Sequence, residues 1–394
     1  MANRQILVAL SAVALTLTAA CGGSSDDGSG GPSGGKVVIG VLASESGELG
    51  LYGVPFIDGA KMAVDKINKA GGFEVDGSKY EFDLKVVDDR SEEAGAVQGA
   101  TELINDSKAK AIIGPLGALG PAVTKIASAR DVLNFSSSSS VAAIAGPPDN
   151  PLNFLTNGSS AGRVQAMFDA ADEFLSDVDS IALVGAEDET AAGLVPLFKK
   201  LAADKGVKLN TYIYPDDATD LSTTLTRVAS SDPDVIFMGW NVDDQTLQGG
   251  QFDAAGIGKD VAMSLFSGTI SGCETLAKGR PCMAHPLAGA DLTSPDLDDN
   301  RKKFVSDFEA FTGDKLPAQT APILWTYDFP NVMAAAMTEA GTVTDTDKIA
   351  AALKSVKYAG VLGDITFDDD NNAVFGYDIT FIAPDGTVRT ANFG

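Results

Sequence analysis

The chain has 394 residues, of which 54 are acidic and 29 basic, so its formal net charge at pH 7 is −25. This charge argues against nucleic acid and against anionic lipid surfaces as binding partners, because both require basic surfaces. A hydrophobic content of 44% is that of a globular protein, and the length allows two lobes that each bury a core.

The first 20 residues have the pattern of a secretory signal. Arg4 is the only charged residue before a mostly apolar run, 6–17, and small residues follow directly before Cys21. The run is too short for a transmembrane anchor, which needs about 20 apolar residues. A signal peptidase of the lipoprotein type cleaves before such a cysteine. We therefore expect a lipoprotein signal peptide at 1–20, lipidation of Cys21, and an extracytoplasmic protein that is anchored to the cell membrane by its N-terminal lipid.

Residues 21–35 are rich in glycine and serine and predict a flexible tether, so the folded part begins near Lys36. Cys273 and Cys282 lie close in sequence, and disulfides persist outside the cytoplasm. We expect a disulfide between them, worth roughly 2.5–3 kcal/mol for a loop this short; two free buried thiols are the alternative. His285 is the only histidine, and two cysteines with one histidine do not make a zinc set, so we predict no metal site.

Apolar β-branched runs alternate with amphipathic helical runs from residue 36 to about residue 313. Several runs are continuously apolar, which is typical of parallel strands buried on both faces. The predicted strands are 37–43, 82–87, 111–114, 132–135, 181–185, 209–214, 235–239 and 261–266. A helix opens with Pro55 in its first turn and stops at Gly71, and helices at 92–106 and 121–130 follow. This repetition predicts an α/β protein with parallel sheets and helices on both faces.

One sheet would need too many strands, so we expect two Rossmann-like lobes joined by a three-segment hinge. The predicted crossings lie near residues 147–156, 286–291 and 358–363. The N-terminal lobe then comprises 36–152 and 290–358, and the C-terminal lobe comprises 157–285 and 363–394. The tail predicts antiparallel strands at 363–367, 377–383 and 387–393. Small ligands bind in the cleft between such lobes, at the carboxyl ends of the strands.

Three loops that follow early strands favour a ligand cleft. They span residues 44–53, 114–120 and 136–140, and they are rich in glycine or serine. Glycine lets the backbone approach a ligand, and serine hydroxyls suit a carboxylate or an amide. None of the loops has the dinucleotide-binding or P-loop pattern, so we predict no cofactor.

A catalytic reading of the chain is a remote alternative. Residues 158–162 have the spacing of a nucleophile elbow, and an extracellular serine hydrolase would use Ser160 with His285 as its base. Capping of the next helix by Ser159 or Ser160 explains the segment more simply. We therefore expect no enzyme. Trp325 and Tyr327 fit either the cleft or the core.

Four stretches in order resemble one known family. They are the first βα unit (39–42 with 59–72), the segment 111–115, Tyr327-Asp328 before an Ala-rich helix, and 360–368 with the strands that follow. Together they resemble the substrate-binding proteins of branched-chain amino acid (leucine/isoleucine/valine-type) ABC importers, which have the type I periplasmic binding protein fold. The resemblance covers residues 36–394.

The resemblance implies a solute-binding lipoprotein that captures a small polar ligand by hinge closure and passes it to ABC permease subunits in the membrane. The ligand would be an amino acid, an amide or a small carboxylate. A ligand-sensing receptor domain without a transport role is the alternative, and such a sensor continues into a transmembrane or signalling segment. The family's contacts fall on Tyr52, Gly117, Ala118, Ser138, Ser139, Ser140, Thr190, Trp240, Asn241 and Phe266.

The chain departs from the family where an acid should bind the ligand's ammonium group. Phe266 and Ser267 occupy that place after the strand 261–265, and the next acid is Glu274. The acids on neighbouring loops that are candidates to replace it are Glu187, Asp188, Glu189 and Asp243. If none does, the resemblance implies a ligand without an ammonium group, namely an amide, a short carboxylate or an aromatic acid.

Overall fold

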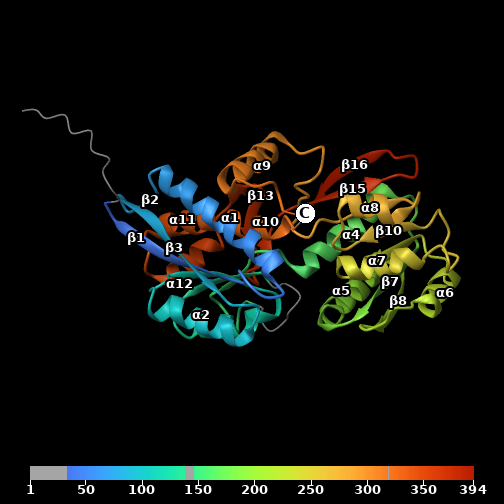
Figure 1. The fold of residues 1–394 in the computed structure, drawn as a ribbon, viewed down its shortest axis with the longest axis horizontal. Coiled ribbons are helices and arrows are strands. Elements are labelled where there is room, and N and C mark those ends of the chain that lie inside the picture. Colours follow the sequence, from blue (N-terminus) through green and yellow to red (C-terminus); the bar gives the residue numbers. More distant parts are fainter. Residues whose placement is uncertain (1–32, 138–145, 318) are drawn as a thin grey trace, which may run out of the picture. The chain divides into compact units, whose positions relative to one another are not determined.

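The computed structural model describes residues 33–137, 146–317 and 319–394 (Figure 1). Every strand predicted between residues 37 and 266 has a counterpart, and most neighbouring strands are parallel. The predicted α/β class is therefore confirmed. The signal peptide 1–20, Cys21 and Ser138, Ser139 and Ser140 lie outside the described residues.

The first sheet combines one antiparallel edge with parallel strands. Its order is β2 (Phe73–Val75), β3 (Ser78–Asp88), β1 (Gly35–Ala43), β4 (Ala111–Leu116), β5 (Leu133–Ser137) and β6 (Asn153–Leu155). Only the β2–β3 pair is antiparallel. Ile39 and Val41 of β1 belong to one buried cluster and Leu42 to another, so successive side chains fill cores on both faces, as the continuous apolar run predicts.

Helices cover both faces of this sheet. One cluster contains residues of α2 (Glu93–Asn105) and α3 (Gly120–Ser128). The other contains residues of α1 (Gly50–Lys69), α10 (Ala321–Tyr327), α11 (Phe329–Ala340) and α12 (Thr346–Leu353). The helix α9 (Asp299–Thr312) packs on α1, where Lys66 Nζ lies 2.7 Å from Asp307 Oδ2.

The second sheet has a parallel centre and an antiparallel end. Its order is β16 (Val388–Phe393), β15 (Tyr377–Ile382), β11 (Cys282–Ala284), β10 (Ala262–Leu265), β9 (Val235–Met238), β7 (Ser180–Glu187) and β8 (Lys208–Pro215). One face packs on α4 (Ser160–Phe174) and α5 (Glu189–Lys205). The other packs on α6 (Ser222–Ser230), α7 (Val242–Gln251) and α8 (Ile270–Ala277).

The first helix begins earlier than predicted. It starts at Gly50, so Pro55 lies inside α1 rather than in its first turn, and Tyr52 is a helical residue. A close approach explains the shift. A Cβ on Gly53 would lie 1.9 Å from the Ser44 carbonyl oxygen, so only glycine lets the helix pass the end of β1. The predicted loop 44–53 is therefore half helix.

The tail also differs from the prediction. β13 (Gly363–Phe367) pairs with β12 (Tyr358–Gly360) and β14 (Ala373–Val374) in a small antiparallel sheet. Phe367 packs edge-on against Phe154 of β6, with ring centroids 5.0 Å apart, and the Asn371 side chain donates to the Pro151 and Asn153 carbonyls. These contacts attach β13 and β14 to the first sheet. We therefore place the third crossing between β14 and β15, which corrects the assignment of 363–394 as a whole to the second lobe.

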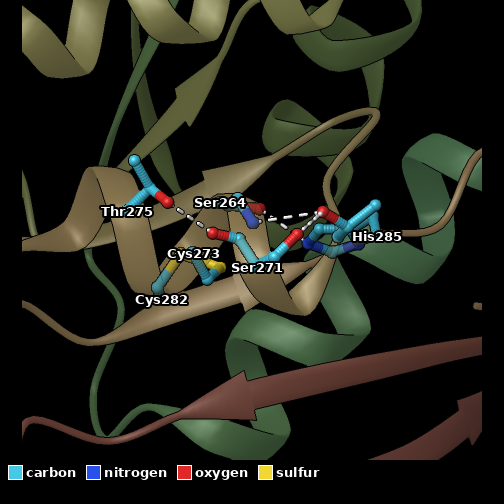
Figure 2. The surroundings of a disulfide bond; sticks show 8 residues. Ser264, Ser271, Cys273, Thr275, Cys282 and His285 are labelled. Carbon is cyan, nitrogen blue, oxygen red and sulfur yellow. Dashed lines mark hydrogen bonds between the residues drawn. A yellow bond between two sulfur atoms is a disulfide. The ribbon is translucent and has the colours of Figure 1, made fainter. Parts of the chain in front are cut away.

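Cys273 of α8 and Cys282 of β11 form a disulfide, with Cα atoms 5.7 Å apart (Figure 2). It ties α8 to the strand that leads into the second crossing. None of the helices in the described ranges is both long and apolar enough to cross a membrane.

Candidate ligand-binding site

A cavity of about 300 Å³ lies at the carboxyl ends of strands from both sheets. Leu116 and Ser137 end β4 and β5 of the first sheet, whereas Trp240 and Phe266 follow β9 and β10 of the second. The cavity is lined by Leu49, Tyr52, Leu116, Gly117, Ser137, Asn157, Ser160, Arg163, Thr190, Leu194, Trp240, Phe266, Leu287 and Trp325. This is where a ligand binds in open α/β sheets.

The cavity brings together half of the predicted contacts. Those that line it are Tyr52, Gly117, Thr190, Trp240 and Phe266. Their contact with a ligand stays a prediction. Gly117 has φ of +56°, which glycine adopts without strain, and it begins the 3₁₀ turn η1 (Gly117–Leu119).

Two predicted contacts do not line the cavity. Ala118 is exposed on η1. Asn241 caps α7, where its Oδ1 accepts from the Asp244 backbone N–H at 2.9 Å. Contact of Ala118 and Asn241 with a ligand therefore stays a prediction.

The most informative lining residue that the sequence analysis missed is Arg163. It begins the buried stripe of α4, because Met167 and Phe174 follow it at helical spacing and are also buried. A charged residue on an apolar helical stripe is the signal that would have found it. Ser137, from the predicted cleft loop 136–140, and Trp325, for which cleft and core were both open, also line the cavity, as does Asn157, which was not predicted.

Aromatic rings form much of the cavity wall. Trp240 and Phe266 meet edge to face, with centroids 6.2 Å apart and an interplanar angle of 88°. The indole of Trp240 donates to the Ala186 carbonyl at 2.9 Å, which fixes its orientation. Tyr52 and Trp325 line the cavity from α1 and α10, two helices that cover the first sheet. These rings suit a flat apolar ligand body.

Arg163 is 5% exposed, its Nη2 donates to the Leu287 carbonyl at 2.5 Å, and its guanidinium also forms a hydrogen bond with the Tyr377 hydroxyl. Its guanidinium carbon lies 5.1 Å from the centre of the Phe266 ring and 5.9 Å from that of Tyr377. Its Nε has no partner among the described residues. Burial lowers the pKa of Arg163, because the charged form loses hydration.

His285 is buried and does not line the cavity; its Nε2 and the Ser264 Oγ are 2.7 Å apart (Figure 2). Burial and the nearby Arg163 lower the pKa of His285 to about 3, so its ring is neutral at neutral pH. Ser159 caps α4 by accepting from the Gly162 N–H at 2.9 Å. A histidine with this pKa that is bonded to Ser264 is a poor general base, so the structure does not favour the hydrolase reading.

Three of the four acids that were candidates for an ammonium site, Glu187, Asp188 and Asp243, do not line the cavity. Glu187 and Asp243 are exposed. Asp188 caps α5, where its Oδ1 accepts from the Ala191 N–H at 2.7 Å. The side chain of Glu189 lies outside the described part of the structure. Along the cavity wall as described, Arg163 is the only charged side chain.

Two lobes of mainly parallel sheet, with a cavity at the ends of their strands, define the type I binding-protein fold. The chain belongs to the periplasmic binding protein family, whose model matches residues 36–386. Solute binding is the function of this family, and the resemblance found in the sequence is confirmed.

Relatives of known description agree with this placement. The Leu/Ile/Val-binding protein BraC3 of Rhizobium johnstonii is 28% identical over 348 residues, which cover 84% of this chain and 88% of the relative. The binding protein LivJ of Streptococcus pneumoniae, solved with isoleucine, matches with a TM-score of 0.65 and 21% identity over 91% of this chain and 99% of its own. A solute-binding protein of Rhodopseudomonas palustris HaA2, solved with p-hydroxybenzoic acid, has a TM-score of 0.70 and 18% identity over 91% of this chain and 96% of its own.

Proposed function

We propose that this solute-binding protein serves an ABC importer, binds its ligand in the cavity between the two sheets, and passes it to the permease. The observation that carries the proposal is a single cavity lined by residues that flank both sheets. A ligand that contacts both groups of residues favours the closed state of a hinged protein, because its affinity differs between the open and closed states.

The relatives define a set of candidate ligands. One is named for leucine, isoleucine and valine, one holds isoleucine and one holds p-hydroxybenzoic acid. For this chain we propose a small ligand with one polar end and an apolar body, which includes amino acids, amides and small carboxylates. The mixture of aromatic rings with few polar side chains in the cavity supports such a ligand.

Calorimetry and thermal unfolding of the folded part with a panel of amino acids, amides and carboxylates test this proposal. A ligand at 100 times its Kd stabilises the native state by about 2.7 kcal/mol. We expect at least one class to bind and Phe266→Ala to weaken its binding. Thr269→Ala, which alters the N-cap of α8 at a residue that does not line the cavity, is the control. Failure of every compound in the panel to stabilise the protein would contradict the proposal.

We also propose that the protein is held at the membrane by a lipid on Cys21. The support is the short apolar run and the small residues before that cysteine. Metabolic labelling with a fatty acid should mark the full-length protein and fail to mark Cys21→Ala. Equal labelling of both forms would exclude this anchor.

A further inference from the structure

Three residues that line the cavity each carry a buried polar atom that lacks a hydrogen-bond partner among the described residues. The atoms are Arg163 Nε, Trp325 Nε1 and Asn157 Oδ1. A buried polar group that is left without a partner costs about 1–3 kcal/mol, and such groups are uncommon in native proteins. Three of them around one cavity indicate a ligand that completes them. Two of the three are N–H donors, so the ligand offers acceptors.

The charge on the cavity wall is positive, and none of the described carboxylates pairs with it. Arginine stays protonated in proteins, and the arginine ion pairs in the described residues are those of Arg280 and Arg301. A buried charge without a partner is strongly unfavourable. An anionic ligand supplies the missing charge, and a carboxylate matches the planar guanidinium geometry.

The size of the positive charge limits the ligand to one negative charge. His285, which is close enough to Arg163 to be affected by its charge, is neutral at neutral pH because burial and Arg163 disfavour its protonation. Since no acid lines the described wall, an ammonium group on the ligand would face the Arg163 cation with no carboxylate of the described residues beside it. An amino acid is therefore disfavoured relative to the acid that lacks its amino group.

We propose that the ligand is a monocarboxylate with an aromatic or apolar body and no ammonium group, and that Arg163 binds its carboxylate. The rings of Trp240, Phe266 and Trp325 enclose the body. The inference rests on the proposed solute-binding function and narrows its ligand class.

Three compounds with the same phenyl body test the ligand class by calorimetry: 3-phenylpropionate, 3-phenylpropanamide and phenylalanine. A hydrogen bond to a charged group contributes about 1.5–3 kcal/mol, so the acid should bind roughly 10- to 100-fold more tightly than the amide. It should also bind at least about 10-fold more tightly than phenylalanine, whose ammonium group has no partner. The pair 4-methylpentanoate and leucine repeats the comparison with an aliphatic body.

Two variants locate the effect. Arg163→Met should remove most of the preference for acid over amide, while Arg163→Lys, which keeps the charge, should retain part of it. Arg280→Lys, at an arginine that is buried away from the cavity, should leave the preference unchanged. The wild-type series does not depend on whether Arg163→Met folds.

The outcomes separate the two proposals. If the amino acids bind more tightly than the matched acids, the inference is wrong and solute binding stands. If the acids are preferred but Arg163→Met retains the full preference, the assignment to Arg163 is wrong. If no compound of any class binds, solute binding in this cavity fails and the inference fails with it.

Discussion

Two buried arginines in this protein have opposite surroundings. Arg280, 1% exposed, donates to Asp253 at 2.7 Å, to the Ile257 carbonyl at 2.9 Å and to the Gly258 carbonyl at 3.0 Å. Arg163, 5% exposed, donates to the Leu287 carbonyl, forms a hydrogen bond with the Tyr377 hydroxyl and otherwise faces the Phe266 and Tyr377 rings. A guanidinium has five N–H donors, so the first is nearly saturated and the second is not. The difference distinguishes an arginine that holds the fold together from one that is positioned to receive a ligand.

The largest expected effect is on the saturated arginine. Arg280→Met removes the donor of the buried Ile257 and Gly258 carbonyls, so we expect the free energy of unfolding to fall by about 2–4 kcal/mol. Urea unfolding measures this loss. In the matched variant Arg163→Met, removal of an unpaired charge offsets the lost bonds to Leu287 and Tyr377, and the ligand-free protein should lose less than about 1 kcal/mol. Equal losses in the two variants would remove the distinction between the two arginines.

Asp328 is a third buried ionisable group and extends the comparison of the two arginines. Unlike an arginine, a buried carboxyl group can lose its charge by binding a proton. Its Oδ2 accepts from the Val361 and Leu362 N–H groups, and its Oδ1 has no partner in the described structure. Burial raises the pKa of Asp328 to about 7, although the two N–H groups lower it. Its folded pKa therefore exceeds the unfolded value of about 4.

Between these two pKa values the folded state binds more protons than the unfolded state, so the contribution of Asp328 to stability is complete below pH 4 and is lost as the pH rises to about 7. The slope is at most about 1.4 kcal/mol per pH unit. Asp328→Asn should flatten the decline in unfolding free energy between pH 4 and 7. Parallel pH profiles for wild type and variant would show that Asp328 titrates normally.

The smallest expected effect concerns the serines of the third loop. If Arg163 carries the carboxylate, Ser138 and Ser140 contribute at most hydrogen bonds of ordinary strength. Ser138→Ala or Ser140→Ala should then weaken acid binding by roughly 3- to 10-fold, from 0.5–1.5 kcal/mol. A loss of about 100-fold would place the charged end of the ligand on the serine loop instead. Titration calorimetry with 3-phenylpropionate distinguishes the two results.

The sequence predicted the parts of the fold that depend on local pattern. The strands 37–43 and 111–114 were found because both faces of a parallel strand are apolar. The place of β13 was not predicted, because it depends on contacts that Phe367 and Asn371 make with β6, more than two hundred residues earlier in the chain. Such contacts leave no periodic signal in an antiparallel strand.

The site residues also divide into those that the sequence predicted and those that only the structure revealed. Tyr52, Gly117 and Trp240 were predicted from the resemblance to the family, and Tyr52 and Gly117 also lie in loops that the strand pattern placed at a cleft. Arg163 was missed because it lies on a helix and because its role depends on which groups are absent around it. The sequence shows that an arginine is present, but only the structure shows that no described carboxylate pairs with it.

The most direct test of the central claim is the coupling between Arg163 and the ligand's carboxylate. It requires four affinities, namely those of 3-phenylpropionate and 3-phenylpropanamide for wild type and for Arg163→Met. We predict that the acid-to-amide affinity ratio is roughly 10- to 100-fold larger in wild type than in the variant. Equal ratios in the two proteins would contradict the claim that Arg163 binds the carboxylate.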